Sequence, residues 1–435
     1  MKRYKDIPYI LLAFYGLLAY AIGTMLAITS FLGYIVKLLS VGFILWTLIK
    51  APKGNKTGKL STIISLFVGY TVFILLRGTI IGRVPVDMGH QVTSIYGIVQ
   101  FFLWNQYSSL SFIVILFILV PFDPKEIGYY RVFTYICTAL CLIGVIRYGD
   151  YLFNATTFGR TDLTINGREL SIRNLITASF IGLGAVFLHA YNYNLFRKSI
   201  LDYLPLVILV MYFVSTVAGG GRGGSITAFI YCLGALFFYI QGTKEKRKSS
   251  PFRIITVAIV IVAAVYGLQY MYTTGYFDFL FYRLFEGGEI GGELNESSRE
   301  GYIANLVDYF NAHPLYWAFG CGANGYYTIT NGLRSTIETG WWYLILKGGI
   351  IYLVLYVYLL LKAAYLGFFK SKNHFAKSIG VLCLIRAYTL IPFGLPEVSL
   401  EFVMIMHFVS LINSDSLRNM SDAEIKVLIN ERTRS

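Results

Sequence analysis

Long apolar runs recur along this chain from end to end, and they constrain its fold more than any other feature. A helix that crosses a lipid bilayer needs about 20 mostly apolar residues. Of the 435 residues, 56% are hydrophobic and only 14% are charged, whereas about a quarter of the residues of a soluble domain are charged. The sequence therefore predicts an all-α polytopic membrane protein with about twelve transmembrane helices. The runs lie at 8–29, 31–49, 61–80, 107–121, 129–147, 172–190, 203–218, 225–241, 254–272, 338–361, 378–394 and 396–413.

The order of the runs predicts four parts of the chain. Spans one to nine occupy 1–272, a long loop occupies 273–337, spans ten to twelve occupy 338–413, and a tail occupies 414–435. The span count can change by one, because 107–121 is the weakest run and Ile95–Trp104 beside it could be a re-entrant or interfacial piece. No repeat relates the two halves of the chain, which argues against the many transporters that are built from repeated halves.

The basic residues are distributed unevenly between the two sides that alternating spans define. Lys and Arg collect in short cytoplasmic loops, and about two-thirds of the 37 basic residues fall on one side if the chain starts in the cytoplasm. This pattern predicts that both termini and the 414–435 tail are cytoplasmic and that the 273–337 loop faces outward. It also accounts for the net charge of +14 without nucleic acid, because no basic helix, zinc-ligand spacing or stacking platform accompanies it.

The remaining basic residues are nearly all Arg, whereas the cytoplasmic group is mostly Lys. They are Lys37, Arg77, Arg83, Arg147, Arg160, Arg168, Arg173, Arg222, Arg283, Arg299, Arg334, Lys347 and Arg386. Arg stays protonated, and its planar fork matches phosphate and carboxylate oxygens. The alternative is that these residues pair with lipid headgroups or acidic loop residues. As a set, they favour an anion-binding site on the outer face.

A glycine-rich hairpin, Gly219-Gly-Gly-Arg222-Gly-Gly-Ser225, joins the seventh and eighth spans on the outer side. Its bare backbone would admit a bulky anion to Arg222, with Ser225 and the N–H groups that open the next helix as further donors. The alternative is a tight turn. Arg222 could act together with Arg77, Arg83, Arg283 and Arg299 on one multiply charged group such as a pyrophosphate, although each arginine could instead anchor the interface or form a salt bridge.

The long loop carries further motifs. Glu286–Glu296 contains four Gly and four Glu and is typical of a mobile segment. Ser297-Ser-Arg-Glu300 fits a capping box with Ser297 as the N-cap, followed by an amphipathic helix along the membrane surface that ends before Pro314.

Two titratable residues beside the arginines are candidates for chemistry. His313 could be a general base or a phosphate ligand, or it could cap the amphipathic helix. Glu338 opens the tenth span just after Arg334 and could be functional, since a carboxylate at a membrane helix mouth is costly unless paired; it could also compensate the helix dipole. No acidic cluster has the pattern of a metal site, so neither a metal nor another cofactor is expected.

These motifs together resemble those of the bacterial O-antigen polymerase and O-antigen ligase superfamily. The resemblance rests on the Gly-Arg-Gly hairpin, one long outer loop late in the chain, and Ser298-Arg299 ahead of an amphipathic helix. It also rests on His313-Pro-Leu with a following Gly-x-Gly, and on the glycine-bearing helix Glu338–Leu361. The motifs cover roughly residues 200–360, and the topology covers the whole chain.

The resemblance implies a GT-C-like membrane glycosyltransferase in the bacterial inner membrane with its active site facing the periplasm. Donor and acceptor would be polyprenyl-pyrophosphate-linked glycans, in contact with membrane lipid and with a chain-length regulator as a possible partner. Arg222, Arg283 and Arg299 would bind the pyrophosphate, with Arg77 or Arg83. Arg222 and Arg299 would stabilise charge on the leaving group, and Glu338 would act as the base.

At one position this chain differs from the family pattern, and the difference bears on whether it is a polymerase or a ligase. Ligase-type members place a histidine at the helix mouth where this chain has Glu338, which favours a polymerase over a ligase that transfers glycan to the lipid A core. The spacing from His313 to the Gly-x-Gly is also longer here, so its family role does not carry over directly. A flippase or transporter for a lipid-linked oligosaccharide is the third hypothesis.

Overall fold

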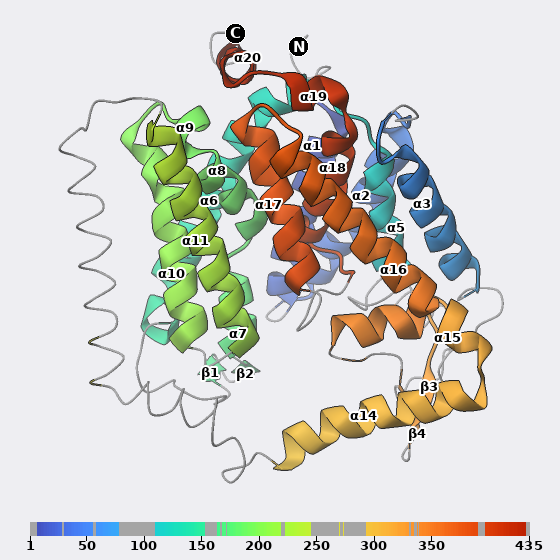
Figure 1. Ribbon diagram of the computed structural model, residues 1–435. Helices are drawn as coiled ribbons and strands as arrows, with labels where there is room; N and C mark the ends of the chain where they lie inside the picture. The colour runs from blue at the N-terminus through green and yellow to red at the C-terminus, as the bar shows by residue number, and fades with distance from the viewer. Residues whose placement is uncertain are drawn as a thin grey trace.

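The structure is a computed structural model of a helical membrane protein. It describes residues 7–27, 30–54, 58–77, 109–152, 163–165, 168–170, 172–218, 222–244, 269, 273, 293–329, 332–334, 337, 339–389 and 396–431. In this part of the chain, six helices are long and apolar enough to cross a membrane. Figure 1 shows most of the long helices side by side in a bundle. The predicted all-α membrane class is confirmed at this level, while the number of spans stays a prediction.

Helices overlap every predicted span of which the structure describes more than one residue. These helices are α1 (Tyr9–Ala27), α2 (Leu32–Lys50), α3 (Ser61–Leu76), α5 (Ser109–Ile113) with the 3₁₀ helix η4 (Val114–Leu119), α6 (Lys125–Leu152), α7 (Ile172–Ser179) with α8 (Leu183–Tyr191), α10 (Leu204–Ala218), α11 (Arg222–Lys244), α16 (Gly340–Phe369), α17 (His374–Thr389) and α18 (Leu400–Asn413). Ile95–Trp104 lies outside the described residues, as does all of 254–272 except residue 269.

The sixth predicted span is not one continuous helix, so that prediction was wrong. The chain breaks between α7 and α8 at Gly182, whose φ of 80° lies in the left-handed region. A Cβ at Gly182 would lie 2.8 Å from the Cys137 sulfur of α6. The end of α7 also packs closely on α6, because a Cβ at Gly144 would lie 2.2 Å from the Ser179 carbonyl oxygen. Close packing on α6 therefore accompanies the break.

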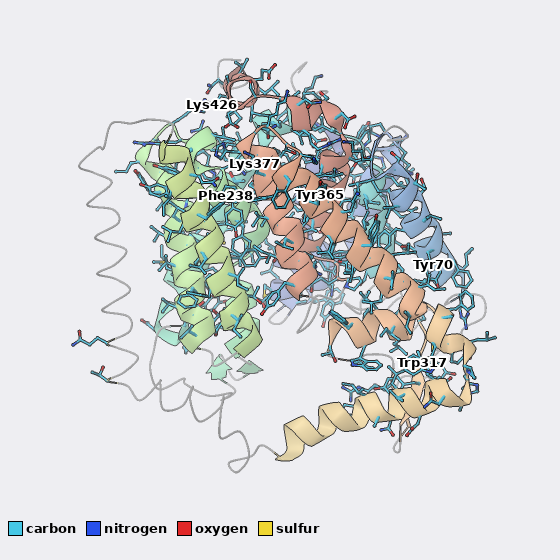
Figure 2. All side chains as sticks on the ribbon, viewed as in Figure 1. Tyr70, Phe238, Trp317, Tyr365, Lys377 and Lys426 are labelled. Atoms are coloured by element: carbon cyan, nitrogen blue, oxygen red, sulfur yellow. The ribbon has the colours of Figure 1, made fainter. Side chains whose placement is uncertain are left out.

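One end of the bundle gathers junctions that the charge pattern assigns to the cytoplasm. There the Leu60 N–H donates to Asn413 Oδ1 at 2.8 Å, joining the start of α3 to the end of α18. The predicted tail folds back as α19 (Asp415–Asn419) and α20 (Asp422–Glu431), and the Lys372 N–H donates to the Arg418 carbonyl at 2.9 Å. Lys377 and Lys426 lie at this end in Figure 2. Which side of the membrane it faces stays a prediction.

The opposite end is crossed by a long helix, α14 (Glu293–Ala312), which lies across the direction of the bundle helices (Figure 1). The helix ends before Pro314, as the sequence predicts, but it begins before Ser297, so Ser297 is not its N-cap. Glu293–Glu296 was also expected in a mobile segment, whereas it forms the first turn, where glutamates favour the positive end of the helix dipole. The predicted ninth-span extension through the interface, 276–285, lies outside the described residues.

Short elements connect α14 to the bundle. They are α15 (Leu315–Phe319), the antiparallel hairpin of β3 (Tyr327–Ile329) and β4 (Gly332–Arg334), and the start of α16. Leu306 and Phe310 of α14 are fully buried in a small apolar cluster that includes Tyr327 and Leu346. A second hairpin, β1 (Leu163–Ile165) with β2 (Arg168–Leu170), lies near the same end (Figure 1).

Candidate functional site

The tenth predicted span bends where the loop after α15 docks on it. Gly349 interrupts α16 with φ 72° and ψ −176°, so the segment before it turns away from the long segment. A Cβ at Gly349 would lie 2.1 Å from the Ala318 carbonyl oxygen, and one at Gly320 would lie 2.5 Å from the Gly348 nitrogen. The glycines of the Gly-x-Gly region and of α16 therefore allow two backbones to touch.

Backbone hydrogen bonds hold this loop against α16 and α3. The Cys321 N–H donates to the Leu346 carbonyl at 2.7 Å, and the Gly322 N–H donates to the Lys347 carbonyl at 2.9 Å. The Tyr70 hydroxyl of α3 lies 3.0 Å from the Gly348 carbonyl oxygen and 3.2 Å from that of Ala318. Tyr70 and Trp317 of α15 mark this region in Figure 2. The loop is thus fixed between two helices that are far apart in the sequence.

Two of the predicted site residues lie against the same aromatic ring. The Arg77 guanidinium, directly after α3, is 5.3 Å from the Tyr316 ring centroid. The His313 ring is 5.3 Å from the Tyr316 ring and 5.0 Å from the Tyr309 ring. Burial raises the pKa of the Tyr309 hydroxyl to about 12. The tertiary structure brings Arg77 and His313 together around Tyr316 of α15.

A third predicted residue lies beside α14 on the hairpin. The Arg334 guanidinium of β4 is 3.6 Å from the Tyr302 ring centroid, and Arg334 pairs in register with Tyr327 of β3. Arg299 lies three residues before Tyr302 in the sequence of α14, about one helical turn away.

Arg222 lies at a different element, at the start of α11. It is the first residue of that helix, where unsatisfied backbone N–H groups and the helix dipole favour an anion. The hydroxyl of Ser225, which was expected to add partial positive charge beside Arg222, donates to the Thr216 carbonyl of α10 at 3.0 Å and so joins α10 to α11. A role of Ser225 at an anion stays a prediction.

The other predicted site residues lie outside the described part of the chain. They are Arg83, Arg283 and Glu338. Among the described residues, no group of three or more His, Cys, Asp or Glu side chains could hold a metal ion.

A buried lysine next to the loop escaped the sequence prediction of site residues. Lys347 of α16 is 1% exposed, and its Nζ donates to the Gly325 carbonyl at 2.8 Å. Asn324 beside it is 3% exposed and accepts a hydrogen bond from the Ser109 hydroxyl at 3.1 Å through Oδ1. The available signal was a lysine inside an apolar run, since ionisable residues at membrane depth are functional candidates.

A second buried charged group connects three helices in the interior of the bundle. Glu401 of α18 accepts a hydrogen bond from the Tyr231 hydroxyl of α11 at 2.6 Å. Arg386 of α17 is 6% exposed, and its guanidinium lies 5.2 Å from the Phe402 ring centroid. The side chains join α11, α17 and α18. The same rule, a charged residue within an apolar run, would have found both Arg386 and Glu401.

Two further buried polar networks lie away from the predicted site. In one of them, the Asp202 carboxylate accepts hydrogen bonds from the backbone N–H groups of Lys198 and Ser199 at 2.7 and 2.8 Å. The same carboxylate lies 3.1 Å from His189 Nε2 and 3.8 Å from Arg131 Nη2. In the other network, His407 Nε2 lies 2.8 Å from Glu126 Oε2. Both carboxylates are satisfied by neighbouring elements, which is the pattern of residues that hold helices together.

Comparison of the chain with protein-family models, with curated proteins and with solved structures finds no match. The geometry of the site is therefore the basis for a functional proposal.

Proposed function

We propose that this protein is a surface-polysaccharide polymerase of the O-antigen type in the bacterial inner membrane. It transfers a growing polyprenyl-pyrophosphate-linked glycan onto a lipid-linked repeat unit at the periplasmic face, with inversion at the anomeric carbon and without a metal ion. In this proposal, the end of the bundle crossed by α14 faces the periplasm and the end that carries α19 and α20 faces the cytoplasm, with about twelve spans between them.

One observation carries the proposal. The loop after α15 docks between α3 and α16 and brings Arg77, from the far end of the sequence, against Tyr316 beside His313. The long loop and the third predicted span therefore contribute to one place at the end of the bundle, where a cation and an imidazole both lie against the Tyr316 ring. Arg334 against α14 adds a second cation on the same loop. A bulky lipid-linked anion is the kind of ligand that such cations bind.

In the reaction that we propose, arginines stabilise the leaving group and a carboxylate acts as the base. A hydroxyl oxygen of the acceptor sugar attacks the anomeric carbon, and the bond from that carbon to the pyrophosphate oxygen breaks on the opposite face. Arginines stabilise the negative charge that builds on the departing pyrophosphate; the candidates are Arg222, Arg299, Arg283 and Arg77 or Arg83. Glu338 is the proposed base that takes the acceptor proton.

The test is single substitution of Arg77, Arg222 and Arg299 by Lys in cells that carry the matching repeat-unit pathway. Lys keeps the charge but loses the planar fork, so polymer yield should fall by roughly tenfold or more for each variant at the pyrophosphate. Arg197→Lys, at the other end of the bundle, is the matched control and should polymerise normally. Unchanged polymer lengths in all three variants would refute the arginine site.

Deletion distinguishes polymerase from ligase. Loss of a polymerase leaves single repeats on the final acceptor, whereas loss of a ligase leaves long polymer on the polyprenyl carrier. A Glu338→Gln variant with full activity would remove Glu338 as the base while leaving the arginine site untouched.

A further inference from the structure

The Gly320–Gly325 loop covers a buried ammonium group that has few acceptors around it. Lys347 carries three N–H donors, and the described part of the structure shows one acceptor for them, the Gly325 carbonyl at 2.8 Å. No ion pair between Lys347 and a carboxylate is present among the described residues. The Nζ also lies 5.4 Å from the Tyr343 ring centroid, and an ionisable residue at membrane depth without a counter-charge is a candidate functional residue.

A second donor beside this lysine is also unsatisfied. Asn324 precedes Gly325, is 3% exposed, and uses its Oδ1 to accept from Ser109. In the described part of the chain, its Nδ2 has no hydrogen-bond partner. Buried polar atoms in native proteins are nearly always paired. Asn324 Nδ2 therefore lacks an acceptor, and Lys347, which donates to the carbonyl of the next loop residue, has donors to spare at the same buried place.

The surroundings of this place are also rich in donors and positive charge. Burial raises the pKa of the Cys321 thiol to about 12, while the positive charges of Lys347 and Arg77 act to lower it, so both cations lie near one loop residue. The loop N–H groups of Cys321, Gly322 and Ala323 are all engaged with carbonyls of α16 or α3, which fixes the loop in place. A surplus of donors with positive charge is suited to an anion with several oxygen acceptors.

We propose that Lys347 and Asn324, beneath the Gly320–Gly325 loop and next to Arg77, form an anion site that binds a phosphate group of a prenyl pyrophosphate. This inference rests on the proposed function for the identity of the lipid-linked donor. Lys347 contributes the charge, and the Asn324 amide contributes a neutral donor. Because Lys347 is 1% exposed, binding of the phosphate requires the hydrogen bonds of the Cys321 and Gly322 N–H groups to α16 to break.

The test is direct binding of farnesyl pyrophosphate to the purified full chain in nanodiscs of uncharged lipid. Wild type should bind it, and Lys347→Met should bind it roughly tenfold more weakly or worse, as expected for a lost charged hydrogen bond. Lys362→Met, on the same helix beyond the bend, is the matched control and should bind like wild type. Asn324→Leu, which keeps the lysine, should weaken binding by a smaller factor. Normal binding by Lys347→Met would overturn the assignment.

Competition distinguishes the possible sources of the phosphate. Inorganic pyrophosphate should compete with farnesyl pyrophosphate and farnesol should not, because the site binds the anionic group. Full competition by anionic phospholipid in the nanodisc would mean a general headgroup site and would overturn the assignment to the donor. Should Lys347→Met unfold, the Asn324→Leu variant provides the comparison, and normal binding by Asn324→Leu would count against the site.

The polymerase function and the Lys347 site can be refuted independently of each other. If wild type polymerises lipid-linked repeats and Lys347→Met binds farnesyl pyrophosphate normally, the polymerase stands and the Lys347 site is wrong. If wild type binds farnesyl pyrophosphate through Lys347 but no polymer forms in the matching pathway, the site stands and the polymerase is wrong.

Discussion

Gly349→Ala tests the docking of the loop on α16, on which the candidate site depends. The backbone of Gly349, at φ 72° and ψ −176°, lies in a region that only glycine adopts readily, with strain of about 1–3 kcal/mol for other residues. The new Cβ would also lie 2.1 Å from the Ala318 carbonyl oxygen. Since neither backbone can rotate away, the loop must separate from α16.

The expected loss of stability in Gly349→Ala follows from these contacts. Separation breaks the two loop-to-α16 hydrogen bonds of 2.7 and 2.9 Å, each contributing about 1 kcal/mol. With the backbone strain, the total cost is about 3–5 kcal/mol. Gly69→Ala in α3 is the matched control, because no atom lies within 4 Å of its added Cβ. Alanine in a helix interior should be neutral or stabilising there by about 0.5–1 kcal/mol.

The assay is thermal unfolding in detergent, followed with a dye that becomes fluorescent on reaction with thiols. The buried Cys137, Cys141 and Cys383 become reactive only when the bundle opens. Gly349→Ala should lower the unfolding temperature by several degrees, whereas Gly69→Ala should leave it unchanged or raise it. Equal unfolding temperatures for the two variants would refute the reasoning about the bend and the docked loop.

Three other predictions concern charged and ionisable groups. Burial would raise the pKa of the Asp422 carboxyl, but hydrogen bonds from the His374 side chain and N–H outweigh it and lower the pKa. Asp422→Asn should therefore reduce stability at neutral pH. Its difference from wild type in thermal unfolding should shrink as the pH falls below about 4 and vanish below the lowered pKa of the folded state. Asp202→Asn should destabilise the protein by about 3–5 kcal/mol because it leaves the buried Arg131 without its carboxylate, and an unchanged unfolding temperature would contradict this. Because burial raises the pKa of Cys321 to about 12, Cys321 kept as the sole cysteine should react with maleimide at pH 8 much more slowly than a free thiol. Reaction at the free-thiol rate would contradict the raised pKa.

The positions of the helices could be read from the sequence, because a bilayer requires every spanning backbone to satisfy its own hydrogen bonds within an apolar segment. Residues 8–29, 31–49 and 203–218 coincide closely with α1, α2 and α10. Local sequence was less informative where tertiary packing determines the conformation of the backbone. The break at Gly182 and the bend at Gly349 depend on how closely another backbone approaches, and a hydropathy window does not register that distance.

The same division applies to the candidate site. The sequence by itself determined that the basic residues outside the junctions assigned to the cytoplasm are nearly all arginines, because the charge bias of short loops can be counted without coordinates. Only the tertiary structure decided which of these residues meet. Arg77 and His313 are far apart in the chain and lie together because a loop docks between α3 and α16. Lys347 gained its importance in the same way, since burial and missing acceptors are properties of packing that no single segment encodes.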